Sequence, residues 1–301
     1  MIRIFEVGPR DGLQNESKVL ATDQKLELIQ KLLDAGLDQI EVGAFVRPDR
    51  VPQMAGTDEI YRSERMAQWK SAYPAVKFWS LVPNEKGLIR AEESGARHIA
   101  IFGGATETFV QKNIGMSIEE SLQVFSAVVK RARQNNFEVR GYISVCWVCP
   151  YEGEVQPDAV MRIVQPMLDM GVQEISLGDT VGRAHPKTTE ALLTRVLKVA
   201  PREKFAVHFH DTYGMAIANI DRSIQMGIQT VDSSIGGLGG CPYAAGATGN
   251  VATEDVYTLL EGYGEATLDV EKLLAAGEYA QSLLGKTLPS KRLAAYMRKS
   301  V

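Results

Sequence analysis

The segment HFHDTYG (208–214) places two of the four histidines of the chain two residues apart. In an extended strand, alternate side chains point to the same face, so His208 and His210 would lie on one side and Phe209 on the other. Two imidazoles at a strand end can bind one metal ion. They could also be two hydrogen-bonded histidines of a buried layer, or part of a turn. The motif alone leaves these alternatives open.

Polar residues at the ends of other predicted strands favour a metal site. Arg10 and Asp11 follow the first strand in GPRDGLQNE, Glu41 lies on the second, Asp179 ends SLGD, and Asn250 closes a glycine-rich loop. The Asp11 carboxylate and the Asn250 amide oxygen, together with the two imidazoles, would form a nitrogen and oxygen site without thiolate. Such a site suits an octahedral Mg²⁺ or Mn²⁺, although Zn²⁺ or Co²⁺ could also occupy it.

The elements that must position these residues follow an alternating pattern of short β-rich runs and longer helical runs. Four strands follow a glycine that ends the preceding helix, in AGLDQIEV, SGARHIAIF, MGVQEISLG and MGIQTVDSS. A capping box at Ser117–Glu120 opens one helix. Eight strands are predicted, over residues 2–7, 39–45, 77–82, 98–103, 139–145, 174–178, 205–210 and 230–235.

This alternation predicts an α/β fold, a (β/α)₈ TIM barrel, with a doubly wound open sheet as the rival. We expect a single domain over residues 1–301, with the barrel over about 1–262. The remainder, about 263–301, reads as extra C-terminal helices that form a cap or an oligomer contact. In a TIM barrel the polar strand ends would meet at one face and form the active site.

Composition narrows the class of protein. The net charge of −4 and the pI near 5.7 argue against a nucleic-acid-binding surface. The longest uncharged stretch, 233–253, contains six glycines and many polar groups, so it does not read as a membrane span. Three cysteines are typical of a reducing compartment, and we expect a cytoplasmic protein without nucleic-acid or membrane partners.

Several residues have two interpretations. Arg10 could form a structural ion pair with Asp11 or stabilise an oxyanion. Glu41 could hold the geometry of the site or transfer a proton. Cys241 lies in the glycine-rich segment 236–249, and could be a small buried residue or a proton-handling thiol on a lid. Cys146 and Cys149 have CxxC spacing but lack the context of a redox or zinc motif.

The motifs together resemble the 3-hydroxy-3-methylglutaryl-CoA lyase family, within the metal-dependent barrel enzymes that make or break Claisen-type bonds. The resemblance covers nearly the whole chain and rests on EVGPRDGLQNE (6–16), VPQM (51–54), KNIGMSIEES (112–121), CPYEG (149–153), EISLGDT (174–180), HFHDTYG (208–214), GLGGCPYAAGATGN (237–250) and ATEDV (252–256).

This resemblance implies a TIM barrel whose Mg²⁺ or Mn²⁺ is held by Asp11, His208, His210 and Asn250. It also implies that Arg10 steadies an enolate oxygen and that Cys241 closes on the substrate. Asp11 or His208 would be the base, and Glu41 would match the buried glutamate of the family. For an acyl-CoA substrate we add Gln14, Asn84 and Asn113 as candidate contacts. The family further implies a homodimer and a place in leucine degradation.

The implied reaction is cleavage of 3-hydroxy-3-methylglutaryl-CoA, or a close 3-hydroxy acyl-CoA, to acetyl-CoA and acetoacetate or another keto acid. Five departures from the family pattern leave the exact substrate open: Ala44, Arg50, Val148, Arg183 and His185. A citramalyl-CoA-like thioester is one alternative substrate. A Claisen condensation synthase of the isopropylmalate or homocitrate type is an alternative activity, and a barrel that only binds acyl-CoA or metal is a non-enzymatic one.

Overall fold

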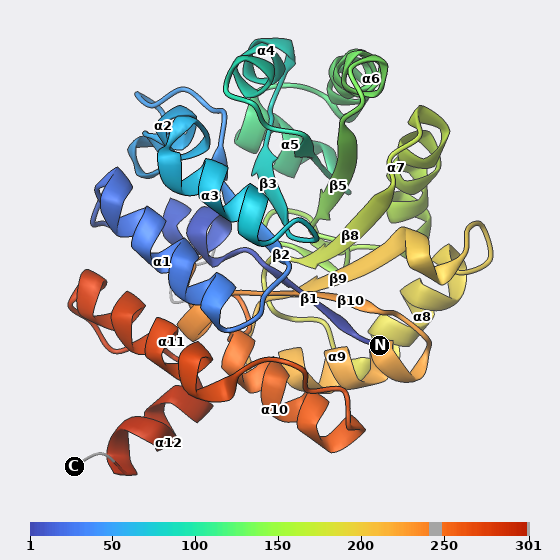
Figure 1. Ribbon diagram of the computed structural model, residues 1–301. Coiled ribbons are helices and arrows are strands. Elements are labelled where there is room, and N and C mark those ends of the chain that lie inside the picture. Colours follow the sequence, from blue (N-terminus) through green and yellow to red (C-terminus); the bar gives the residue numbers. More distant parts are fainter. Residues whose placement is uncertain (241–248, 300–301) are drawn as a thin grey trace.

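A computed structural model describes residues 1–240 and 249–299 and contains a closed barrel of eight parallel strands (Figure 1). The strand order around the barrel is β1-β10-β9-β8-β5-β4-β3-β2, which confirms the predicted TIM barrel and excludes the open sheet. Each predicted strand is present. Their bounds are β1 Arg3–Glu6, β2 Gln39–Ala44, β3 Lys77–Leu81, β4 His98–Gly104, β5 Glu138–Ser144, β8 Glu174–Asp179, β9 Phe205–Phe209 and β10 Thr230–Ser233.

Helices surround the barrel (Figure 1). The predicted helix-ending glycines are confirmed; Gly36 and Gly171, for example, have positive φ angles of 95° and 87°, a conformation that favours glycine. The capping box at Ser117 is also present. The barrel helices are α1 Thr22–Asp34, α2 Thr57–Arg62, α3 Glu64–Ala72, α4 Glu85–Glu93, α5 Glu107–Ile114, α6 Ile118–Gln134, α7 Pro157–Met170, α8 Pro186–Val196, α9 Ala216–Gln225 and α10 Thr253–Tyr263.

Two short features were not predicted. A small hairpin, β6 Val148–Cys149 and β7 Gly153–Glu154, follows β5, and a π-helical turn, η1 Gly8–Gly12, follows β1. Two-residue strands have no recognisable periodicity, and π turns are rare but frequent at functional sites. The described connections also contain three 3₁₀ turns: η2 Pro52–Met54, η3 Arg202–Lys204 and η4 Ile235–Gly237.

The two extra C-terminal helices, α11 Val270–Leu284 and α12 Lys291–Lys299, lie beside the barrel helices α1 and α10 (Figure 1). The segment between them packs against η4, where Ser290 N donates to the Gly236 carbonyl at 3.2 Å. The extra helices therefore extend the outer helical layer and support the start of the β10–α10 loop. Among the described residues, no helix is long and apolar enough to cross a membrane.

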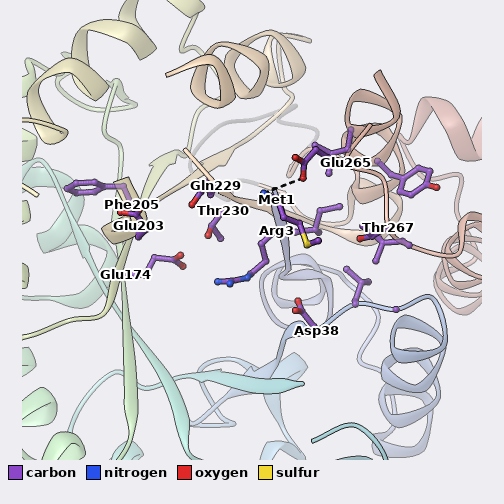
Figure 2. Close-up of a pocket in the computed structure, with 16 residues that line it drawn as sticks. Met1, Arg3, Asp38, Glu174, Glu203, Phe205, Gln229, Thr230, Glu265 and Thr267 are labelled. Carbon is purple, nitrogen blue, oxygen red and sulfur yellow. Dashed lines mark ion pairs between the residues drawn. The ribbon is translucent and has the colours of Figure 1, made fainter. Parts of the chain in front are cut away.

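A cavity of about 270 Å³ lies at the amino-terminal end of the barrel (Figure 2). Its walls include Arg3, Asp38, Glu174 and Thr230, which precede or begin strands, and the Met1 amino group lies 3.5 Å from Glu265 Oε2. This cavity is at the opposite end of the barrel from the strand ends that carry the predicted site residues.

Candidate active site

The carboxyl ends of β1 and β9 bring three potential metal ligands together. Asp11 lies on the η1 turn after β1, His208 is on β9, and His210 directly follows that strand. One ligand atom from each residue lies within 4.8 Å of the others. His208 Nε2 is 3.9 Å from Asp11 Oδ2. The two histidines thus lie on the same side, as the strand alternation predicted, and beside the carboxyl end of β1.

The chemical state of these residues fits a divalent cation. His210 is buried, and its Nδ1 forms no hydrogen bond with the part of the chain that the structure describes. Burial and the neighbouring His208 lower the pKa of His210 to about 4, so the imidazole is neutral, as a metal ligand must be. Burial raises the pKa of the Asp11 carboxyl group, but Arg10 and the two histidines lower it by a larger amount. The pKa of Asp11 therefore lies below the usual range for aspartate. A metal ion is a partner that would satisfy both groups.

Asn250 joins this cluster through its backbone and side chain. It forms an isolated bridge with His210, and its Nδ2 donates to Asp11 Oδ2 at 2.8 Å and to the Leu238 carbonyl at 3.1 Å. The amide nitrogen, rather than the predicted ligand oxygen, thus faces Asp11. Ligation by Oδ1 requires the carboxamide to turn about its Cβ–Cγ bond, and it stays a prediction.

Arg10 lies between two carboxylates. Its Nη1 donates to Asp11 Oδ1 and its Nε to Glu41 Oε2, both at 2.6 Å. Its guanidinium also lies 5.2 Å from the ring centre of Tyr142, whose hydroxyl donates to Glu41 Oε2 at 3.1 Å. Burial lowers the pKa of Arg10, but Glu41 and Asp11 raise it more strongly, so Arg10 stays charged.

Glu41 is fully buried, and burial raises its pKa despite the opposing effect of Arg10. Its Oε2 binds Arg10 and Tyr142, whereas its Oε1 has no hydrogen-bond partner within the described chain. The contacts of Oε2 are those of a residue that holds Arg10 in place. The unpaired Oε1 is the oxygen that a proton-transfer role would use, and that role stays a prediction.

Sequence reasoning missed the residues that hold His208. Its Nδ1 lies 3.2 Å from Asp232 Oδ2, on the adjacent strand β10, and Asp232 is bound by Arg140 from β5 and by Ser176 from β8. Burial raises the pKa of Asp232, but Arg140 and His208 lower it, with a net lowering. The available signal was an aspartate inside the buried run TVDSSI (230–235) and an arginine inside VRGYISV (139–145).

Asp179, at the end of β8, has a different arrangement. Its carboxylate accepts hydrogen bonds from the backbone amides of Gly182, Arg183 and Ala184, at 3.1, 3.1 and 2.8 Å. Burial raises its pKa to about 6. These bonds organise the loop after β8, and Asp179 is outside the Asp11, His208 and His210 cluster.

A cavity of about 410 Å³ opens onto the cluster. The three predicted CoA contacts, Gln14, Asn84 and Asn113, all line it, and so does Arg50. Asn84 also caps α4, because its Oδ1 accepts from Gly87 N at 3.1 Å. Cys241 lies outside the described residues.

The other departures from the family pattern are located elsewhere. Ala44 is buried on β2. Val148, Arg183 and His185 line a separate cavity of about 510 Å³, between the β6–β7 hairpin and α8. Arg50 is therefore the departure that lines the cavity of the candidate site.

A parallel α/β barrel with an Asp-His-His cluster at the carboxyl ends of its strands, beside a buried arginine, belongs to the class of metal-dependent barrel enzymes. The chain belongs to the HMGL-like family, whose sequence profile matches residues 1–279. It is 47% identical over 300 residues to a Pseudomonas aeruginosa protein named 3-hydroxy-3-isohexenylglutaryl-CoA/hydroxy-methylglutaryl-CoA lyase. The alignment covers 99% of this chain and 98% of that protein.

Two solved structures extend the comparison. The crystal structure of hydroxymethylglutaryl-CoA lyase from Pseudomonas aeruginosa matches with a TM-score of 0.93 at 46% identity, over 99% of this chain and 98% of that one. An HMG-CoA lyase from Acinetobacter baumannii, in complex with coenzyme A and 3-methylmalate, matches with a TM-score of 0.90 at 32% identity, over 98% and 94%.

Proposed function

We propose that this protein is a divalent-metal-dependent carbon–carbon lyase that cleaves 3-hydroxy-3-methylglutaryl-CoA to acetyl-CoA and acetoacetate. The observation that carries the proposal is the cluster of Asp11, His208 and His210 beside the charged Arg10, facing a cavity of about 410 Å³. Near-full-length relatives named as lyases support cleavage rather than the condensation of a synthase or binding alone.

The metal would be held by Asp11, His208, His210 and, after rotation of its amide, Asn250. A bound Mg²⁺ or Mn²⁺ would supply Lewis acidity for the tertiary hydroxyl and a carboxylate of the substrate. Mg²⁺ and Mn²⁺ are both compatible with this donor set, as are Zn²⁺ and Co²⁺. The choice of metal is part of the test below.

The reaction requires three things of the side chains. A base, Asp11 or His208, accepts the hydroxyl proton as the carbonyl of the keto acid forms. The carbon–carbon bond breaks, and its electron pair moves onto the thioester as an enolate. Arg10 stabilises that enolate oxygen: its Nε and Nη1 bind Glu41 and Asp11, while Nη2 makes no hydrogen bond to the described chain. An acid then protonates the enolate carbon and yields acetyl-CoA.

The acid of the last step is proposed to be Cys241 or a histidine. Cys241 follows directly on Gly240, which lines the candidate cavity. Replacement of Cys241 by serine tests this role, since a weaker acid would slow protonation of the enolate while leaving metal binding intact.

An acyl-CoA substrate is supported by the Acinetobacter structure, which is a complex with coenzyme A. We propose that Gln14, Asn84 and Asn113 contact the CoA part of the substrate, since all three line the same cavity. The capping bond of Asn84 uses its amide oxygen and leaves the amide NH₂ group for this contact.

Two observations each favour a different further substrate, one with a hydrocarbon branch at carbon 3 and one with an anionic branch. The name of the Pseudomonas relative includes a thioester with a longer branch at carbon 3. Arg50 is an exposed cation on the cavity wall, which would attract an anionic branch, as in a carboxymethyl or citramalyl-CoA-like thioester. We propose to measure these thioesters beside 3-hydroxy-3-methylglutaryl-CoA.

The decisive experiment follows acetyl-CoA release from each thioester with Mg²⁺ or Mn²⁺. Release from 3-hydroxy-3-methylglutaryl-CoA, abolished by His208→Ala and by Arg10→Met, is the expected result. Release only from a thioester with a longer or an anionic branch at carbon 3 would support a lyase that acts on a different substrate. No release from any thioester by a metal-loaded, folded protein would refute the proposal.

We further propose that the protein is a cytoplasmic homodimer that acts in leucine degradation. The proposal of a dimer rests on the family resemblance, and light scattering of the purified chain tests it directly. The cytoplasmic location rests on the composition and the cysteine count of the sequence.

A further inference from the structure

The two histidines of the metal cluster are held in different ways. His210 Nδ1 is buried and forms no hydrogen bond to the described chain, whereas His208 Nδ1 lies 3.2 Å from Asp232 Oδ2. His208 and Asp232 are register partners on the adjacent parallel strands β9 and β10, so their side chains leave the sheet side by side. The position of Asp232 is therefore fixed by the barrel itself, not by a loop.

The Asp232 carboxylate is surrounded by hydrogen-bond donors. Arg140 binds it with both terminal nitrogens, at 3.0 Å to Oδ2 and 2.5 Å to Oδ1, and the Ser176 hydroxyl donates to Oδ2 at 2.7 Å. Arg140 and Asp232 both have side chains with 0% exposure. The two bonds from the arginine and the one from the serine favour the carboxylate form, which can act only as an acceptor toward His208.

We propose that Asp232 is a positioning residue for His208: it accepts a hydrogen bond from Nδ1–H and thereby presents the Nε2 lone pair to the metal site. A neutral imidazole carries its proton on one nitrogen, and the partner of one nitrogen decides which nitrogen is free to bind a metal. The other ring nitrogen, Nε2, is the one that lies 3.9 Å from Asp11 Oδ2, on the side of the cluster. Arg140 and Ser176 complete the arrangement by holding the Asp232 carboxylate.

The inference rests on the metal site of the proposed function, but not on the substrate. Its first test therefore uses the full-length, metal-free protein without any thioester. The four histidines of the chain can be labelled with ¹⁵N, and a long-range ¹H–¹⁵N spectrum at pH 8 reports the tautomer of each ring. Replacement of His98 and His185 by glutamine assigns the remaining signals to the site. We expect His208 to be protonated at Nδ1; a ring protonated at Nε2 would overturn the proposal.

The second test replaces Asp232 by asparagine, whose amide NH₂ can donate to Nδ1 and so favours the Nε2–H tautomer. We expect the dissociation constant for Mn²⁺, measured by electron paramagnetic resonance, to rise about 10- to 100-fold. Activity should return at high Mn²⁺ concentration, because the defect lies in metal affinity. Unchanged Mn²⁺ affinity in a folded Asp232→Asn protein would contradict the proposal.

Glu174→Gln is the matched control. Glu174 binds the same arginine, at 2.7 Å from Arg140 Nε, but it lies at the start of β8 and lines the cavity at the other end of the barrel (Figure 2). The Glu174→Gln substitution removes one carboxylate from Arg140 without touching His208. We therefore expect the His208 tautomer and the Mn²⁺ affinity to stay as in the wild type. If Asp232→Asn does not fold, the tautomer of the wild-type protein still decides the question.

Discussion

The Arg10→Met substitution should affect activity and stability through two separable contacts. Arg10 would stabilise the enolate, and removal of one preorganised donor of this kind costs about 10²–10³ in kcat, or about 3–4 kcal/mol. Arg10 also compensates the charge of Glu41, which has 0% exposure and lies 2.6 Å from Arg10 Nε. Removal of one partner from a buried ion pair costs about 3–5 kcal/mol of unfolding free energy. The single variant should therefore be both slow and unstable.

A second substitution separates the two effects. In the Arg10→Met, Glu41→Gln double variant, no uncompensated charge is left at Glu41, and the new amide oxygen can still accept from the Tyr142 hydroxyl. We expect the double variant to recover most of the lost stability, because the penalty came from the buried carboxylate. Activity should stay low, since neither change restores a cation beside the enolate.

The pH dependence provides an independent check. Burial already raises the pKa of Glu41, and loss of the opposing Arg10 would raise it further. A carboxyl group whose pKa is higher in the folded state stabilises the fold below its unfolded pKa, about 4.3, and this stability is lost as the pH rises through the folded pKa. Arg10→Met should thus lose stability from pH 5 to pH 8, by up to about 1.4 kcal/mol per pH unit, relative to the double variant.

The assays are urea unfolding at pH 5, 6.5 and 8, and acetyl-CoA release at the same values. The single Glu41→Gln variant serves as the control for loss of the carboxylate alone. Our reasoning would be refuted if the double variant were no more stable than Arg10→Met at pH 8. It would also be refuted if Arg10→Met retained the wild-type kcat.

Other predictions test the metal, the turn that carries the site, the buried acids and the substrate cavity. Dialysis against a chelator should abolish activity and lower the melting temperature; readdition of Mn²⁺ at about 100 times its dissociation constant should restore about 2.7 kcal/mol, measured by thermal unfolding at several metal concentrations. Gly8→Ala should lower the free energy of unfolding by about 1–3 kcal/mol, because its Cβ would lie 2.6 Å from Glu6 Oε1 at the start of the η1 turn. The same displacement of the turn should also lower kcat. Gly262→Ala is its control, since a Cβ there meets no atom within 4 Å, and it should be neutral or slightly stabilising in the same denaturation assay. Burial raises the pKa of Glu254 to about 8, so the wild-type protein should lose stability as the pH rises from about 4.5 through 8, and Glu254→Gln should show a shallower loss in urea titrations. Arg50→Ala should lower kcat/KM by up to about 5-fold for a thioester with a carboxymethyl branch, the effect of an exposed ion pair, and little for 3-hydroxy-3-methylglutaryl-CoA. Equal effects on both substrates would rule out recognition of the branch.

The sequence was sufficient for the barrel because each repeat carries local signals. Glycines such as Gly36 and Gly171 end a helix just before a strand, and this signal needs no knowledge of the rest of the chain. The β6–β7 hairpin has no comparable signal, since its strands have two residues each. The C-terminal helices were predicted from the helical character of their sequence, but their packing beside α1 and α10 depends on contacts between distant segments.

The candidate site likewise contains residues that the sequence could predict and residues that it could not. Asp11, His208 and His210 each stand at a strand end, and the barrel fold alone predicts that such residues meet. Asp232 and Arg140 lie inside strands β10 and β5, which are not neighbours in the barrel. Their contact spans the barrel interior and depends on the register and tilt of all the strands between them. No local pattern in the sequence encodes that geometry, although a charged residue within a buried strand signals that a partner must exist.

The charges around the cluster give a separate argument for a bound cation. Asp11, Glu41 and Asp232 bind two arginines, Arg10 and Arg140, through contacts of 2.5–2.6 Å. With all three acids ionised, these five side chains carry a net charge of −1, which a cation would offset. Loss of the cation would leave that charge largely buried, and the least solvated acid would then take up a proton. Glu41 is fully buried, has an unpaired oxygen and has a raised pKa, so it is the group expected to do so. Metal binding near neutral pH should therefore release a proton, and Glu41→Gln should abolish that release in calorimetry performed in buffers of different ionisation enthalpy.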